Sequence, residues 1–148
     1  MKNILIDSGF WFAYLGTRND GLQEVAKTIY ERILSFGCTV IVPFPSLYET
    51  VNTKLLKDKN KAAADWFLNQ LHSNPRIEIV VDDKYRDAAL RVTSFNRDRG
   101  ISLVDNILRL MMSDKQLRID TLITFNTSDF IDVCFKNRIE LVNEHFQS

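Results

Sequence analysis

The chain has 148 residues, of which 45% are hydrophobic and 26% are charged, and its nineteen acidic residues balance nineteen basic ones. This length is enough for one domain with a sizeable core, so we expect residues 1–148 to form a single domain. A formal net charge of zero argues against a protein that coats nucleic acid through bulk electrostatics, and it leaves open an enzyme with a local basic rim.

The cysteines and the apolar segments restrict the protein class further. Cys38 and Cys134 do not have a spacing typical of zinc ligands, so we interpret both as reduced, small apolar residues. The first apolar run is broken by Asp7 after three residues, which does not fit a signal peptide. No apolar run approaches the roughly 20 residues of a membrane helix. We therefore expect a cytoplasmic protein that does not enter a membrane.

Short apolar runs alternate with segments of helical periodicity along the whole chain. Strands are predicted at residues 4–6, 38–42, 77–81, 121–125 and 139–142. Helices are predicted at residues 10–15, 20–36, 46–57, 60–72, 82–99 and 102–114, with a short turn or helix at 129–135. Strands separated by helices favour a parallel sheet covered on both faces. The predicted fold is α/β, with three layers around a central parallel sheet of about five strands.

Four acidic residues are expected at one edge of this sheet. Asp7 directly follows the first strand, and Glu49 lies in the helix after the second strand. Asp105 is in the first turn of the helix at 102–114, and Asp129 follows the fourth strand. Ligands of open α/β sheets bind at the carboxyl ends of the strands, so the four carboxylates are predicted to converge there.

Each acid also has an alternative interpretation as a helix cap. The segment from Ser46 to Glu49 matches the capping box Ser-x-x-Glu. Asp105 supplies suitable negative charge to a helix N-terminus, and Asp7 and Asp129 have the composition of caps for short helices. The residues around Asp105 are almost wholly apolar, however, and a capping acid does not need such shielding.

Carboxylates that meet repel one another. At about 4 Å and an effective dielectric constant near 20, each close pair costs roughly 4 kcal/mol. A bound cation offsets this repulsion, and oxygen-rich carboxylate sites suit Mg²⁺ or Mn²⁺. Such ions keep several of their waters, which hydrolysis of a phosphodiester requires.

Four segments of the chain, residues 4–15, 42–49, 101–108 and 122–130, resemble in this order the motifs of the PIN-domain nucleases, particularly the VapC-like toxins of toxin–antitoxin pairs. The resemblance covers nearly the full chain. In the last motif many members have an acid where this chain has Asn126, which leaves Asp129 as the match to the fourth carboxylate. An amide oxygen binds a hard cation more weakly than a carboxylate, so the number of metal ions, one or two, stays open.

The resemblance implies a PIN-like fold and a Mg²⁺- or Mn²⁺-dependent endoribonuclease that cleaves single-stranded RNA. All four acids are candidate metal ligands and catalytic residues. Asp7 and Asp105 would be the principal ligands, Glu49 would orient or deprotonate the attacking water, and Asp129 would complete the acidic pocket. The supporting residues, which would position ligands or a phosphate oxygen, would be Ser8, Thr124 and Asn126.

The resemblance also implies a homodimer and an antitoxin that inhibits the nuclease. The aromatic-rich N-terminal segment is expected to form an exposed apolar patch that serves as an interface. For Trp11, base stacking is an alternative, but its apolar neighbours favour packing in the core or at a dimer interface. Basic side chains could line an RNA path or form a solvated face; they are Lys54, Lys57, Lys59, Lys61, Arg97 and Arg99.

Other functions fit the residues less well. A catalytically idle PIN-like domain that binds RNA or a partner protein is the main alternative, and the presence of all four acids counts against it. A receiver-like domain would need an adjacent acid beside Asp7 and a lysine after the last strand, and both are absent from the sequence. A dinucleotide-binding domain would need a GxGxxG turn after the first strand, which is also absent.

Overall fold

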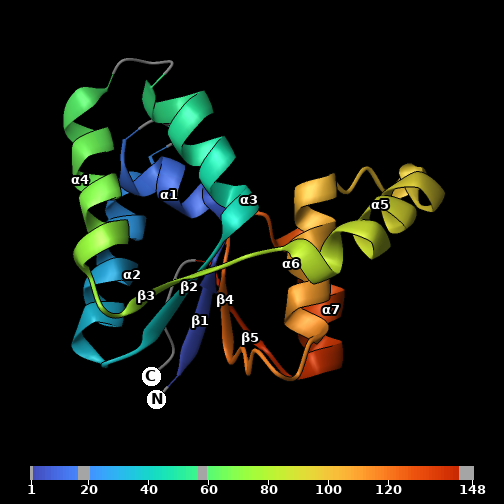
Figure 1. Ribbon diagram of the computed structural model, residues 1–148. Helices are drawn as coiled ribbons and strands as arrows, with labels where there is room; N and C mark the ends of the chain where they lie inside the picture. Colours follow the sequence, from blue (N-terminus) through green and yellow to red (C-terminus); the bar gives the residue numbers. More distant parts are fainter. Residues whose placement is uncertain (1, 17–20, 57–59, 144–148) are drawn as a thin grey trace.

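A central parallel sheet organises the protein (Figure 1). The structure is a computed structural model that describes residues 2–16, 21–56 and 60–143, without the side chains of 53–56. The strands are β1 (Asn3–Ile6), β2 (Thr39–Pro43), β3 (Ile77–Val80), β4 (Thr121–Ile123) and β5 (Glu140–Val142). Their order across the sheet is β3-β2-β1-β4-β5, and every neighbouring pair is parallel. All five predicted strands are confirmed.

Helices connect the strands. The α-helices are α1 (Ser8–Tyr14), α2 (Gln23–Ser35), α3 (Phe44–Leu47), α4 (Lys61–Ser73), α5 (Arg86–Phe95), α6 (Leu103–Ser113) and α7 (Ile131–Asn137). A π-helix, η1 (Tyr48–Leu56), continues directly from α3. Three single 3₁₀ turns complete the described elements: η2 (Asp83–Tyr85), η3 (Arg97–Arg99) and η4 (Thr127–Asp129).

Several predicted helices differ from the structure in their bounds. The helix expected at 82–99 is divided, because Asn96 leaves the helical region with φ −109° and ψ 37° between α5 and η3. The helix expected at 46–57 begins two residues earlier, at Phe44, and changes to the π form at Tyr48. π-helical turns are rare and occur frequently at functional sites. The helix predicted at 20–36 begins later than expected, at Gln23, since Gly21 and Leu22 precede the helix. The end predicted at residue 57 lies outside the described residues.

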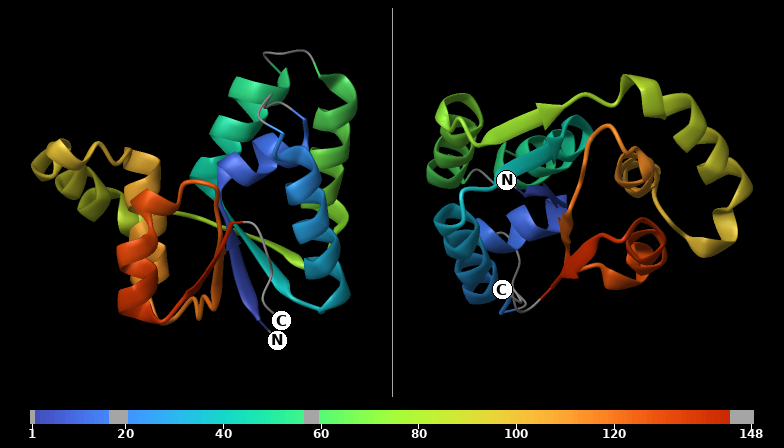
Figure 2. Two further views of the ribbon diagram at one scale, coloured as in Figure 1. Left: turned by 180° about the vertical axis from the view of Figure 1, so that it is seen from behind. Right: turned by 90° about the horizontal axis from the view of Figure 1, so that it is seen from below.

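The sheet has a separate apolar core on each face, because successive residues of a strand point to opposite sides. Ile4 and Ile6 of β1 belong to the core shared with α1, α2 and α4. Leu5 lies between them in the chain and belongs to the core shared with α5, α6 and α7. Figure 2 shows these two groups of helices on opposite faces of the sheet. The predicted three-layer α/β architecture is confirmed.

The aromatic residues of α1 are in the core and do not form a surface patch. Phe10 and Trp11 are fully buried, and the Trp11 ring packs edge-on against Phe67 and Tyr30 at centroid distances of 5.1 and 5.7 Å. The expectation of an exposed apolar patch from this segment was therefore wrong for these two rings, since they fill the space between α1, α2 and α4. The core interpretation of Trp11 is confirmed.

Two simpler expectations concern the cysteines and the membrane. Cys38 and Cys134 are both buried and unbridged, as predicted. Among the helices of the described residues, none combines the length and the apolar character that crossing a membrane would require.

The packing of Phe67 generates a stability prediction. Substitution of a fully buried phenylalanine by alanine removes its apolar contacts and leaves a cavity, so we expect Phe67→Ala to lower the free energy of unfolding by about 3–5 kcal/mol. Urea unfolding followed by tryptophan fluorescence measures this value. Val81→Ala is the control, because Val81 is 58% exposed and the loss of its side chain should change stability by less than about 0.5 kcal/mol. Equal losses for the two variants would contradict the placement of Phe67 in the core.

Candidate active site

Asp7 and Thr124 meet at the point where the strand order of the sheet reverses. From β1 the chain passes first to β2 on one side, and it later returns to β4 on the other side. Asp7 follows β1 and Thr124 follows β4, and the Thr124 hydroxyl donates a 2.9 Å hydrogen bond to Asp7 Oδ2. The Asp7 N–H donates to the carbonyl of Ile123 at 3.1 Å. Such reversal points are where open α/β sheets bind ligands.

The Asp7 carboxylate is almost completely removed from solvent, with 5% of the residue exposed. Burial raises the pKa of Asp7, and hydrogen bonds from Thr124 and Ser8 oppose the rise. Asp7 occupies the N-cap position of α1, but its side chain makes no capping hydrogen bond. The cap interpretation therefore does not explain why an acid is placed here.

Ser8 lies between two of the acids. Its hydroxyl is 3.4 Å from Asp7 Oδ1 and 3.3 Å from Glu49 Oε1, with geometry that permits donation to either. Glu49 is in the first turn of η1, and its pKa is raised by burial and by the negative charge of Asp7. A single hydroxyl thus connects the end of β1 to the π-helix.

The capping-box interpretation of Ser46 and Glu49 was wrong. The helix α3 begins at Phe44 with Pro43 at its N-cap, so Ser46 lies inside the helix. The Ser46 hydroxyl is buried without a hydrogen-bond partner in the structure. Glu49 instead contacts Ser8, so its side chain is directed to the sheet edge where Asp7 lies.

Asp105 is not the N-cap of α6, although it lies in the first turn of that helix. Ser102 is the N-cap of α6, and its hydroxyl accepts the Asp105 N–H at 3.1 Å. The pKa of the Asp105 carboxyl is raised to about 7, and burial is the largest cause. The negative charges of Asp7, Asp129 and Glu49 and a hydrogen bond with Asp129 contribute the rest of this rise. Each of the other three acids therefore acts on Asp105, which indicates one electrostatic cluster at this edge of the sheet.

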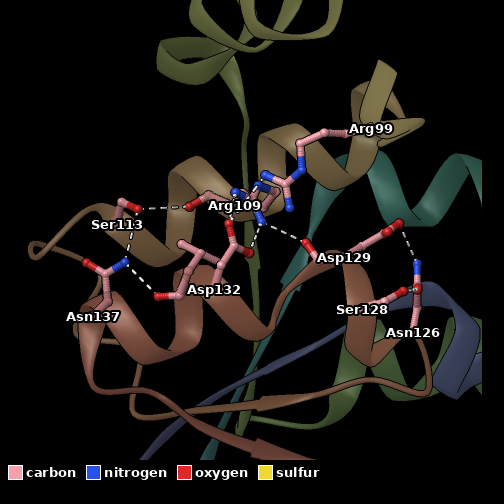
Figure 3. Close-up of polar contacts among 9 residues, drawn as sticks. Arg99, Arg109, Ser113, Asn126, Ser128, Asp129, Asp132 and Asn137 are labelled. Carbon is pink, nitrogen blue, oxygen red and sulfur yellow. Dashed lines mark hydrogen bonds and ion pairs between the residues drawn. The ribbon is translucent and has the colours of Figure 1, made fainter. Parts of the chain in front are cut away.

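Asp129 is held by the turn that follows β4. The Asn126 N–H donates to Thr124 Oγ1 at 2.9 Å, and Asn126 Nδ2 donates to Asp129 Oδ2 at 2.8 Å (Figure 3). Ser128 makes a longer contact of 3.5 Å with Asn126 Oδ1. Asn126 thus takes part in the site by orienting the Asp129 carboxylate.

Arg109 is a residue of the site that the sequence interpretation missed. It lies one helical turn after Asp105 on α6, and its guanidinium donates to the Asp129 carbonyl at 2.7 Å (Figure 3). The same guanidinium binds both carboxylate oxygens of Asp132 at 2.6 and 2.8 Å. Arg109 therefore fixes the backbone of Asp129 relative to Asp105. The spacing of four residues between Asp105 and Arg109 was the available signal.

The basic residues predicted to line an RNA path are only partly described. Lys61 pairs with Asp65 at 2.7 Å, and Arg99 is 3.3 Å from Asp132. Arg97 is exposed in η3. The Lys54 side chain, Lys57 and Lys59 lie outside the described residues.

The donor set fits Mg²⁺ or Mn²⁺. In the described residues, no three His, Cys, Asp or Glu side chains are grouped so that they would hold a metal ion. Mg²⁺ does not need such a cage, because it is bound by one or two carboxylates and keeps several waters. The elevated pKa values of Asp7, Glu49 and Asp105 indicate a site that is short of positive charge. A divalent cation that contacts some of the carboxylates through water agrees with both observations: the described residues contain no close group of three ligands, and the pKa values of the acids are raised.

Two solved structures are similar to this one. VapC20 from Mycobacterium tuberculosis, described as a sarcin–ricin loop cleaving toxin, aligns with a TM-score of 0.69 over 87% of this chain and 94% of its own, at 21% identity. This chain has the fold of a VapC-like PIN domain. FitAcB from Neisseria gonorrhoeae also aligns with this chain, with a TM-score of 0.55 over 95% of this chain and 96% of its own, at 18% identity. The sequence matches no protein-family model and no curated protein.

The elevated pKa of Asp105 predicts how the stability of the metal-free PIN domain depends on pH. Because this pKa is about 7 and the ordinary value is 3.8, the folded protein binds the proton more tightly than the unfolded chain does. Stability should therefore fall as the pH rises from about 4 to about 7. Asp105→Asn removes the charge, so we expect the variant to be more stable than the unchanged protein at pH 8 in chelator, by on the order of 2 kcal/mol after allowance for solvent screening.

Denaturant unfolding at pH 4.5 and pH 8 measures this difference. Asp65→Asn is the matched control, because Asp65 is an exposed acid on α4 whose ion pair with Lys61 contributes little. The control should follow the unchanged protein at both pH values. An Asp105→Asn variant that is less stable at pH 8 would show that the attraction between the Asp105 charge and the N-terminus of α6 outweighs the repulsion from the other acids.

Proposed function

We propose that the protein is a metal-dependent endoribonuclease that cleaves single-stranded RNA, and that it is the toxin of a toxin–antitoxin pair. The observation that carries the proposal is the electrostatic cluster of Asp7, Glu49, Asp105 and Asp129 at the reversal point of a PIN fold. VapC20, which has the same fold, is described as an RNA-loop cleaving toxin, and this supports the proposed class of reaction.

In this proposal Asp7 and Asp105 hold a Mg²⁺ or Mn²⁺ ion, with Glu49 and Asp129 as further ligands, directly or through water. The bound ion supplies an activated water and neutralises charge on the phosphate. Thr124 keeps the Asp7 carboxylate in one orientation through its 2.9 Å hydrogen bond. Asn126 does the same for Asp129.

Glu49 is the residue we assign to proton transfer. Burial and the charge of Asp7 raise its pKa, so its carboxylate is a better proton acceptor than an exposed glutamate. The Ser8 hydroxyl, 3.3 Å from Glu49 Oε1, orients that acceptor. Loss of the Ser8 hydroxyl should therefore affect turnover more than binding of RNA.

A catalytically idle PIN-like domain is the second candidate. It would bind RNA or a partner protein and would not need a complete set of carboxylates. The hydrogen bonds that orient Asp7 and Asp129 favour the enzyme, because an idle domain has no reason to hold two acids in fixed positions beside a third.

Substitution of Asp7 tests the assignment of the site. Asp7→Asn preserves the shape of the side chain and its contact with Thr124 but removes a metal-binding charge. We expect cleavage of a fluorescently labelled single-stranded RNA to fall by at least about 100-fold in Mg²⁺, and Mn²⁺ binding measured by calorimetry to weaken. Asp65→Asn should cleave at the rate of the unchanged protein. Full turnover by a folded Asp7→Asn variant would disprove the site, and full turnover in chelator would disprove the metal requirement.

The resemblance to VapC-like toxins also leads us to propose a homodimer and an antitoxin partner. The dimer would place two sites on one particle. Among the described residues, the most exposed large apolar side chains are Phe95 and Phe135, on α5 and α7, and they are better candidates for an interface than the buried rings of α1. Light scattering at micromolar concentration should give twice the mass of the 17.2 kDa chain. A monomer mass at all concentrations would exclude the dimer without affecting the nuclease assignment.

A further inference from the structure

A basic hollow lies at the edge of the sheet opposite the carboxylates. It has a volume of about 550 Å³ and is formed where α6 and α7 end and where β4 and β5 begin. Four exposed cations line it: Lys115, Arg118, Lys136 and Arg138. The only acid in its lining, Asp114, accepts a hydrogen bond from Tyr85 and pairs with Lys84 at 2.9 Å.

The charges of these four cations are not compensated by neighbouring acids among the described residues. Several other cations are paired with acids, as in Lys2 with Glu140, Lys61 with Asp65, and Arg86 with Asp82. None of the four side chains around the hollow forms an ion pair with any residue that the structure describes. In a chain of zero net charge, this hollow is therefore a local concentration of uncompensated positive charge.

The backbone gives a second, independent observation. Within the described ranges, two residues other than glycine have a positive φ, Arg118 at 50° and Arg138 at 56°, and both line the hollow. This conformation costs an ordinary L-residue on the order of 1 kcal/mol, and glycine or asparagine takes it more readily. Such outliers are concentrated at functional sites. At Arg138 this conformation is the left-handed C-cap that ends α7, a common position for glycine, and both turns place an arginine at the hollow.

The surface of α6 and α7 between the basic hollow and the acids is also hollowed. A second hollow, of about 340 Å³, lies between α6 and α7, and Lys136 lines both. Its lining includes Arg109, which contacts Asp129, and Asp132, whose charge is compensated by Arg109 and Arg99. Asn137 donates to Ser113 Oγ at 3.2 Å and ties the ends of α6 and α7 together between the hollows (Figure 3). From Asp105 to Ser113, where α6 ends, the path is about 12 Å along the helix.

We propose that the basic hollow binds the phosphate backbone of RNA some nucleotides away from the bond that is cut. The strand would follow the two hollows along α6 and α7, from the carboxylate cluster to Lys115, Arg118, Lys136 and Arg138. This inference rests on the proposed ribonuclease function. It adds a site that holds the substrate by charge alone and therefore reads no base.

A structural role for the same cations predicts different behaviour. Lys136 is in the last turn of α7, and Lys115 follows the end of α6, where positive charge interacts favourably with the carbonyl ends of the helices. If that were their whole role, their removal would lower the melting temperature and leave RNA binding unchanged. Stability and RNA affinity therefore have to be measured on the same variants.

The test uses the full chain with Asp7→Asn in every sample, so that RNA is not cut. The hollow variant adds Lys115→Gln and Lys136→Gln, and the matched control adds Lys27→Gln and Arg91→Gln, two exposed cations on α2 and α5. Binding of a fluorescein-labelled 20-nucleotide single-stranded RNA is followed by anisotropy from 50 to 300 mM salt. Because each phosphate contact to a single strand contributes about 0.7 to the salt slope, the hollow variant should lose about 1.4 of that slope and roughly tenfold in affinity near 0.15 M salt.

A second measurement uses the active protein with Asp7 retained. A dinucleotide contains only the phosphate that is cut and cannot extend to the hollow. The two lysine substitutions should therefore lower kcat/KM for the 20-nucleotide RNA about tenfold and leave kcat/KM for the dinucleotide unchanged.

The outcomes are distinct. If the hollow variant and the control bind RNA with equal affinity and equal salt slope, the inference is overturned, whether the cations serve the helix ends or bind an acidic protein segment. If the protein with Asp7 retained cleaves no RNA and the Asp7→Asn protein binds none, the proposed function fails and the inference fails with it. RNA binding with a smaller salt slope in the hollow variant supports the inference even if the cleavage assay is inactive.

Discussion

The hydrogen bond from Thr124 to Asp7 joins the two halves of the sheet, β3-β2-β1 and β4-β5, at the carboxyl ends of β1 and β4. Asp7 ends the first strand, and Thr124 lies more than one hundred residues later, so this contact forms only when β1 and β4 are paired. Both groups are buried, and a buried carboxylate without such a donor would cost several kcal/mol. The positions of Ser8, Glu49 and Asn126 follow from this contact, because each hydrogen-bonds to Asp7, Ser8 or Thr124.

The four acids are brought together against their mutual repulsion, and the surrounding structure shows how they are held. Arg109 binds Asp132 most strongly and holds the pKa of that carboxyl well below the ordinary range, while its hydrogen bond to the Asp129 carbonyl sets the backbone. The charges of Asp129 and Asp105 contribute less to the raised pKa of Arg109. The guanidinium thus gives rigidity to the site and compensates only part of the negative charge of the cluster. That arrangement suits a centre whose positive charge comes from outside the chain.

Much of the fold followed from local patterns, and the failures have physical causes. The β-branched run at Val40–Val42 and the helical spacing of α6 predicted their elements because each buries a regular set of positions. The capping box at Ser46 failed because Pro43 ends β2 in a conformation from which the helix starts at once. The π form of η1, which contacts α1 and α4, was not predicted from the periodicity of the sequence.

The candidate site was predictable to a similar degree. Asp7, Glu49, Asp105 and Asp129 were identifiable because parallel strands bring their carboxyl ends to one edge. The role of Arg109 was missed, because its contact with the candidate site is a hydrogen bond to the backbone carbonyl of Asp129, twenty residues away, and every residue type has such a carbonyl. The basic hollow was missed for a related reason. Its cations come from two chain segments that are separated in sequence, 115–118 and 136–138, and each is unremarkable on its own.

The two cysteines belong to different cores. Cys38 is in the core shared with α1, α2 and α4, and Cys134 is in the core shared with α5, α6 and α7. The sheet separates them, so the folded chain cannot bridge them, and burial raises the pKa of Cys134 to about 11, which suppresses its reactivity. Each thiol becomes available to an alkylating reagent only when its own layer opens. The protein therefore has a built-in probe on each face of the sheet, and the two labelling rates report whether its outer layers separate from the sheet together or independently.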